Sequence, residues 1–311
     1  MQTIITNTYI RQVKRLYLWL VIGFVFFIAW SHSSEFSAAI AYLDMLSAEL
    51  VILCLGLALV SYICRSLRWL VYIRLIEHNT SIIRHIVIYL SGFAFTASPG
   101  KAGELMRGTY LGELGVSFRY TFMSFLSERL FDVIVVSLLG TYFLILQFDV
   151  YFCFLTACFL IIPFIVGPIF KIGLRIGSVR LWCEPIKILV NLWRRDVVIN
   201  NQVLTLLAWS AQGLILFLIL RIFEVEINIV MAISIYCLSL LIGAASFIPS
   251  GIGVTEAGMI WLLNQIGVST DIAIVASLIT RMLTLWPAMI SGVVCSFILR
   301  RSSSKNINSY S

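Results

Sequence analysis

The feature that most constrains this chain is a series of long, uninterrupted apolar runs. A helix that crosses a bilayer needs about 20 consecutive, mostly apolar residues. Of the 311 residues, 60% are hydrophobic and 12% are charged, whereas a soluble domain carries about twice that charged fraction. The sequence therefore predicts an all-α polytopic membrane protein in which residues 1–311 form one transmembrane domain. The predicted crossings lie at about 16–33, 47–64, 120–148, 151–169, 203–222 and 273–299.

Two further apolar segments are interrupted by proline and glycine. Residues 86–97 run into Ser-Pro-Gly at 98–100, and residues 229–248 run into Pro-Ser-Gly at 249–251, before an apolar piece at 254–267. Irregular backbone at membrane depth persists only where it is buried in protein or lines a watery cavity. We therefore expect two re-entrant or broken helical hairpins. The expected breaks are Pro99, Gly100, Gly103, Pro249, Gly251 and Gly253.

The distribution of charge gives an orientation. With the N-terminus in the cytoplasm, 19 of the 22 Lys and Arg residues fall in cytoplasmic segments. Because cations favour that side, we expect about six crossings, two hairpins that open to opposite sides, and both termini in the cytoplasm of a prokaryotic plasma (inner) membrane. The net charge of +7 is spread between apolar runs. This suits anionic lipid headgroups and argues against a nucleic-acid partner.

The two halves of the chain, about 10–148 and 151–300, share an order of features. In each half a glutamate follows the proline of the hairpin, an arginine lies 30 or 32 residues after that proline, and a glycine follows the arginine by 11 residues. Halves that enter the membrane from opposite sides form an inverted-topology repeat, as in transporters with alternating access. The matching residues are Pro99, Glu104, Arg129 and Gly140, and Pro249, Glu256, Arg281 and Gly292.

Charged residues near or within the apolar runs are candidates for substrate binding. Charge in lipid is costly, so such residues face the protein interior or water. Lys101 and Arg107 are expected to face a phosphate, and Glu104 can pair with Arg107 three residues later. The alternative for this group is a plain cytoplasmic turn.

A second set of charges lies inside predicted helices. Arg129 lies within helical reach of Asp132, next to Glu128, and a purely structural ion network is the alternative. Arg281 is the natural partner for Glu256 or Glu128, or it snorkels to the interface. The sequence also suggests an interfacial anchor at a helix end, formed by Arg65, Arg68 and Trp69.

No catalytic constellation is recognisable. The sequence lacks a phosphate-binding Walker loop, a Gly-x-Ser-x-Gly motif and a dinucleotide fingerprint. Its three histidines, His32, His78 and His85, do not cluster. We therefore expect no catalytic residue, no metal and no cofactor.

Several of these short motifs, in this order, resemble the lysylphosphatidylglycerol synthetase transmembrane family. That family includes the flippase domain of the multiple peptide resistance factor, stand-alone flippase-like proteins and archaeal glycosylation-pathway membrane proteins. The resemblance covers about 60–295 and implies lipid translocation. Full-length synthetases carry a soluble aminoacyl-transfer domain after the membrane part, whereas this chain ends at Ser311, so lysyl transfer is not expected. The motifs are Arg68-Trp69, Ser98-Pro99-Gly100 with Gly103-Glu104, Glu128-Arg129 with Asp132, and residues 248–253 with Glu256.

The resulting hypothesis is translocation of a phosphate-bearing lipid or lipid-linked sugar between leaflets, through a polar cavity inside the membrane. An anionic lipid or lipid-linked saccharide is the expected partner. Two alternatives remain open: a membrane-embedded transferase that uses Glu128 or Asp132 as a general base, and a small-solute transporter. The absence of a large hydrophilic loop makes an enzyme the less favoured reading.

Overall fold

The computed structural model describes residues 23, 46–76, 80–96, 98–176 and 183–308. Within this part, five helices are long and apolar enough to cross a membrane. Each coincides with a predicted crossing, while the first predicted crossing, at 16–33, lies outside the described residues apart from position 23. The five are α3 (Ala48–Arg74), α6 (Phe118–Gln147), α7 (Cys153–Ile176), α9 (Arg195–Ile222) and α12 (Thr270–Asn308).

Both predicted hairpins are present as broken helices. In the first, α4 (Ile82–Ser91) and the 3₁₀ segment η1 (Gly92–Phe95) lead to η2 (Pro99–Arg107) and α5 (Gly108–Glu113). In the second, α10 (Ile229–Ala245) leads through η5 (Pro249–Gly251) to α11 (Val254–Gln265). Each proline begins the irregular segment after its break, as expected of a residue without a backbone donor. The remaining short elements are η3 (Val150–Phe152) and α8 (Cys183–Leu192).

Glycine is needed at two of the predicted breaks. Gly251 has φ +62°, a left-handed conformation that costs glycine little, and a Cβ there would lie 2.7 Å from the Cα of Gly243. At Gly103 a Cβ would lie 2.5 Å from the Cβ of Phe95. The backbone N–H of Gly103 also donates to the Ser98 hydroxyl at 2.7 Å. The tight turns therefore depend on these residues.

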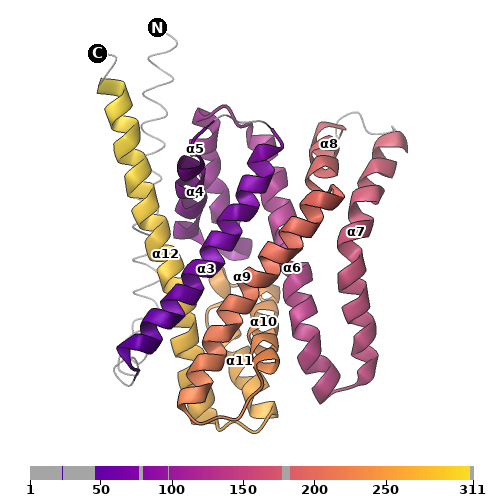
Figure 1. The fold of residues 1–311 in the computed structure, drawn as a ribbon, viewed down its shortest axis with the longest axis vertical. Helices are drawn as coiled ribbons and strands as arrows, with labels where there is room; N and C mark the ends of the chain where they lie inside the picture. Colours follow the sequence, from indigo (N-terminus) through magenta and orange to yellow (C-terminus); the bar gives the residue numbers. More distant parts are fainter. Residues whose placement is uncertain (1–22, 24–45, 77–79, 97, 177–182, 309–311) are drawn as a thin grey trace.

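The same order of elements occurs twice in the described part of the chain. The stretch from α3 to α6 contains a long helix, a shorter apolar helix, an irregular turn with a short helix, and a second long helix. The stretch from α9 to α12 repeats this order. In Figure 1, α3 and α9 run in opposite directions, as do α6 and α12, and the two hairpins enter from opposite ends of the bundle. This arrangement is that of an inverted repeat.

The long helices of each half pack on the hairpin of the other half. At Gly140 of α6, a Cβ would lie 2.7 Å from Leu238 of α10. At Gly292 of α12, a Cβ would collide with the backbone of Phe93 and Ala94 in η1. The two glycines spaced 11 residues after Arg129 and Arg281 thus occupy matching places, where a helix approaches a hairpin closely.

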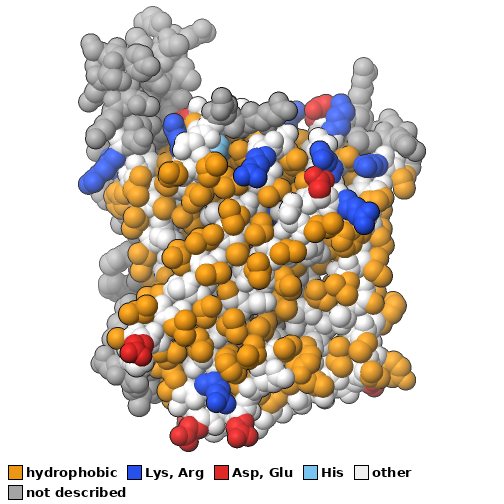
Figure 2. All heavy atoms as spheres, viewed as in Figure 1, with side chains coloured by type: hydrophobic (Ala, Val, Ile, Leu, Met, Phe, Trp, Pro, Cys, Tyr) orange, Lys and Arg blue, Asp and Glu red, His pale blue; other side chains and the backbone are white. Residues whose placement is uncertain are grey.

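The outer surface matches a bilayer. Large apolar side chains such as Ile52 and Phe154 are 69% and 73% exposed, and apolar atoms cover the face seen in Figure 2 over most of its height. On the face seen in Figure 2, cations gather at the end where α9 begins, and acidic residues predominate at the opposite end. A soluble protein rarely exposes so continuous an apolar surface, so the chain is a polytopic membrane protein.

Candidate functional site

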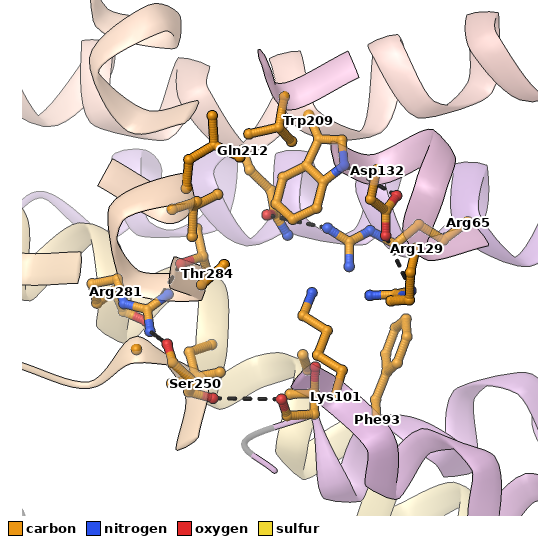
Figure 3. A pocket seen from close by; sticks show the side chains of 18 of the residues that line it. Arg65, Phe93, Lys101, Arg129, Asp132, Trp209, Gln212, Ser250, Arg281 and Thr284 are labelled. Carbon is orange, nitrogen blue, oxygen red and sulfur yellow. Dashed lines mark hydrogen bonds and ion pairs between the residues drawn. The ribbon is translucent and has the colours of Figure 1, made fainter. Parts of the chain in front are cut away.

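A partly open cavity of about 280 Å³ lies where the two hairpins meet, lined by residues of α3, α6, α9, α10, α12 and the first hairpin. Figure 3 shows side chains from both halves of the chain converging on it. One wall is apolar, with Val133, Val136, Leu240, Leu241 and Ala244. Phe93, Ile248, Leu285 and Ala288 add further apolar surface, and polar side chains stand among these residues. The polar residues are Tyr62, Arg65, Thr96, Ser98, Lys101, Arg129, Asp132, Trp209, Gln212, Tyr236, Ser250, Arg281 and Thr284.

Asp132 is the centre of one ion cluster. Its Oδ1 atom lies 2.8 Å from Nη1 of Arg68, and its Oδ2 atom lies 3.1 Å from Nη2 of Arg129. Trp209 also donates from Nε1 to Oδ1 at 3.2 Å. Arg129, three residues from Asp132 along α6, thus pairs with it. Three donors compensate one buried carboxylate, which is what a charge needs in a low-dielectric interior.

The charges of the first hairpin pair differently from the prediction. Glu104 and Arg107 do not pair with each other: Arg107 Nη2 lies 2.8 Å from Glu128 Oε2, and Glu104 Oε2 lies 3.5 Å from Arg129 Nη2. The segment Pro99–Arg107 is a 3₁₀ helix, and α6 packs against it, so both side chains reach the neighbouring helix. The Arg107 guanidinium also lies over the ring of Trp69, 4.8 Å from its centroid.

The second hairpin is held by Arg281. Its Nε atom donates to Glu256 Oε1 at 2.7 Å, and its Nη2 atom donates to the carbonyl of Ser250 at 2.9 Å. The other oxygen of Glu256 accepts from the backbone N–H of Gly253 at 2.7 Å, at the start of α11. Of the two partners predicted for Arg281, Glu256 is the one observed. Arg281 is 8% exposed, so it does not snorkel.

The tips of the two hairpins touch. The hydroxyl of Ser250 donates to the carbonyl of Thr96 at 3.5 Å, and Thr96 in turn donates to Glu104 Oε1 at 3.0 Å. Arg281, which binds Ser250, and Arg129, which binds Glu104, therefore lie on opposite sides of this contact. Both line the same cavity, and they occupy matching positions in the two halves of the chain.

The predicted interfacial anchor is wrong. Arg65, Arg68 and Trp69 are 5%, 0% and 0% exposed, because α3 continues to Arg74 and carries them into the bundle. Arg65 donates to Gln212 at 3.5 Å and lies over the ring of Trp209, 4.2 Å from its centroid. Their spacing in the sequence already indicated burial on one side of a longer helix, because residues three apart share a helix face and the apolar pattern resumes after Trp69.

The predicted binding residues divide into two groups. Lys101, Arg129, Asp132 and Arg281 line the cavity. The other four lie behind that lining: Arg107 pairs with Glu128, and Glu104 and Glu256 pair with Arg129 and Arg281. Sequence reasoning missed Arg65, Trp209 and Gln212 as cavity residues. In the described part of the chain, no group of three His, Cys, Asp or Glu residues is arranged to hold a metal ion.

Comparison with known proteins agrees with this architecture. Two curated relatives from Methanothermobacter thermautotrophicus (strain Delta H), both described as "UPF0104 membrane protein", align with part of the chain. One is 24% identical over 99 residues, which is 32% of this chain and 29% of the relative. The other is 32% identical over 94 residues, which is 30% of this chain and 28% of the relative. The matched stretch thus spans less than a third of each relative.

A family model matches a much longer stretch. The model for the lysylphosphatidylglycerol synthase TM region covers residues 16–292. This range includes α3 to α11 and most of α12, with all eight predicted binding residues and both hairpins. The chain therefore belongs to the lysylphosphatidylglycerol synthase transmembrane-region family.

Proposed function

We propose that this protein translocates a phosphate-bearing lipid, or a lipid-linked sugar, between the two leaflets of the membrane. The observation that carries the proposal is the cavity at the meeting point of two oppositely directed hairpins, which four cationic side chains and a single carboxylate line. Such an excess of cations favours an anionic group. Membership of the lysylphosphatidylglycerol synthase transmembrane-region family also supports a lipid-related function.

The apolar wall of the cavity supports a lipid rather than a small polar solute. Val133 of α6 and Ile248 beside η5 both line the cavity and are 52% and 43% exposed. A headgroup bound by cations next to such a wall leaves its acyl or prenyl tails against apolar side chains. The arrangement thus has separate places for the charged and apolar parts of one lipid.

The hairpins supply the gates in this proposal. The first opens toward the end of the bundle where cations gather, and the second opens toward the acidic end. By the positive-inside preference, we assign the cationic end to the cytoplasm, with both termini there, in a prokaryotic plasma membrane. Alternate loosening of the Thr96–Ser250 contact and of the Arg281–Glu256 pair would expose the site to one side at a time.

The transferase alternative has less support. Its candidate general bases, Glu128 and Asp132, are both engaged by buried arginines, Arg107 and Arg68. Asp132 also accepts from Trp209. A base must reach the proton that it removes, and these carboxylates are held by structural partners instead.

The test is a scrambling assay with purified protein in liposomes that contain fluorescent phospholipids in both leaflets. A membrane-impermeant quencher removes the signal of the outer leaflet, so further loss measures translocation. We expect loss beyond half of the signal with wild-type protein and loss near the level of empty liposomes with Arg129→Ala. A transferase product in the same vesicles without scrambling would overturn the proposal.

A further inference from the structure

Two cations of the cavity lack a carboxylate partner. Within the described residues, Arg129 and Arg281 each make ion pairs with carboxylates, whereas Arg65 and Lys101 make none. Both lie against the same indole: the Arg65 guanidinium is 4.2 Å and the Lys101 ammonium 5.1 Å from the ring centroid of Trp209. Figure 3 shows Lys101 extending into the space between Arg129 and Arg281.

The backbone conformation at Lys101 is unusual for a residue with a side chain. Lys101 has φ +57°, a left-handed conformation that is unfavourable for any residue with a Cβ. It lies two residues after Pro99, and Gly251, two residues after Pro249, adopts φ +62° at the same place in the second hairpin. The first hairpin thus carries a lysine where glycine would fit without strain. The structure of the turn does not require that side chain, which lines the cavity.

We infer that Arg65 and Lys101, held against Trp209, form a site for a terminal phosphate group, and that the lipid carried is a phosphomonoester without a cationic headgroup. This inference rests on the proposed function and specifies its substrate class. Two cations without carboxylate partners match the charge of a phosphomonoester, which is about −1.5 to −2 near neutral pH. A phosphodiester carries a single charge and would leave one cation uncompensated.

The same geometry disfavours lipids with a positive headgroup. The one carboxylate that lines the cavity, Asp132, already pairs with Arg68 and Arg129. Glu104 and Glu256, behind the lining, pair with Arg129 and Arg281. A headgroup ammonium would therefore enter next to cations with no available carboxylate, and like charges at close range repel.

The experiment measures binding separately from transport. Purified protein in detergent is titrated with short-chain phosphatidic acid, phosphatidylglycerol, phosphatidylcholine, lysyl-phosphatidylglycerol and inorganic phosphate. Binding is read as a shift in the midpoint of thermal unfolding and as a Kd. We expect phosphatidic acid to bind at least tenfold more tightly than phosphatidylglycerol, and phosphatidylcholine and lysyl-phosphatidylglycerol to bind more weakly still. Inorganic phosphate should bind the same site more weakly than phosphatidic acid.

The decisive variant is Lys101→Gly. It removes the cation and relieves the left-handed strain, so we expect affinity for phosphatidic acid to fall about tenfold or more with an unchanged or higher unfolding midpoint in the absence of lipid. Lys101→Arg should keep most of the affinity. Arg84→Gln removes an exposed cation on α4 and serves as the matched control for net charge, with wild-type affinity.

Several results would overturn the inference. Equal affinity for phosphatidic acid and phosphatidylcholine, or wild-type affinity in Lys101→Gly, would show that Arg65 and Lys101 do not form a phosphate site. A lower unfolding midpoint in Lys101→Gly would make Lys101 a structural residue. Inorganic phosphate binding as tightly as phosphatidic acid would make the site one for free phosphate. If the protein scrambles lipids without selectivity, the proposed function holds but this phosphate site does not exist. If it binds phosphatidic acid selectively but does not scramble lipids, the site exists and the proposed function is wrong.

Discussion

Each buried arginine near the cavity lies against a carboxylate or an aromatic ring. Arg68 pairs with Asp132, Arg107 pairs with Glu128 and lies over Trp69, and Arg65 lies over Trp209. The ion pairs have a particular consequence for stability. A buried ion pair contributes little net stability when intact, but its disruption leaves an uncompensated charge. The pairs are therefore expected to be sensitive to single substitutions.

Arg68→Met tests this sensitivity away from the cavity. Arg68 is fully buried and also donates to the Thr205 hydroxyl at 2.8 Å. Its replacement should lower the free energy of unfolding by about 3–5 kcal/mol, measured by thermal unfolding in detergent. Adding Asp132→Asn should cost less than the two single changes together, because the carboxylate then needs no partner.

Lys187→Ala is the control: it breaks a pair whose side chains are 59% and 65% exposed and should change the free energy of unfolding by less than about 1 kcal/mol. Equal effects of Arg68→Met and Lys187→Ala would contradict the argument.

Arg281→Lys tests the geometry of the guanidinium rather than its charge. The planar fork holds Glu256 and the carbonyl of Ser250 at the same time, whereas a lysine ammonium is a point charge on a flexible stem. We expect the variant to fold, with scrambling in liposomes slower by about tenfold, in line with the loss of one charged hydrogen bond. Wild-type scrambling by Arg281→Ala would show that this tie has no part in transport.

At the scale of elements, the broken hairpins and the long helices interlock. Gly292 lets α12 approach the backbone of η1, and Gly140 lets α6 approach α10. Because each half packs on the hairpin of the other, movement of one hairpin is felt directly by the long helix of the opposite half. This exchange of contacts is the element-level basis of the alternate gating that we propose.

Gly292→Val should disturb this packing. The added side chain has no space beside Phe93 and Ala94, so we expect a loss of about 1–3 kcal/mol or more in the free energy of unfolding. Gly112→Ala is the matched control, because a Cβ at this α5 position meets nothing within 4 Å. In a helix, that change should be neutral or stabilise the protein by about 0.5–1 kcal/mol. A stable Gly292→Val variant would show that η1 and α12 separate easily.

At the scale of the whole molecule, the bundle has an end where cations gather and an end where acidic residues predominate (Figure 2). The loop between α6 and α7 lies at the acidic end, and α9 begins at the cationic end (Figure 1). The assignment of these ends to the two sides of the membrane follows from charge alone. It is independent of any transported lipid.

Cysteine labelling measures this orientation. Asp149→Cys and Arg194→Cys are placed separately in a variant without native cysteines, since both positions are exposed. In intact cells, an impermeant maleimide should label position 149, and position 194 should react only after permeabilisation. Labelling of position 194 in intact cells would reverse the assigned topology.

The sequence by itself determined the membrane class, the five described crossings and the places where the two hairpins break. These features depend on local properties, namely the length of an apolar run and the backbone limits of Pro99, Pro249 and Gly251. It also indicated that Arg129 and Arg281 occupy equivalent places, because their spacing from proline and glycine is nearly the same in both halves.

Only the tertiary structure decided which charges pair and which remain without a carboxylate. Glu104 lies three residues from Arg107 but pairs with Arg129, and Arg65 faces the cavity instead of the interface. A spacing along one helix gives the face on which a residue lies, whereas its partner is fixed by the helix that packs against that face. The cation pair at Trp209 therefore arises from three segments, α3, η2 and α9, that no local pattern brings together.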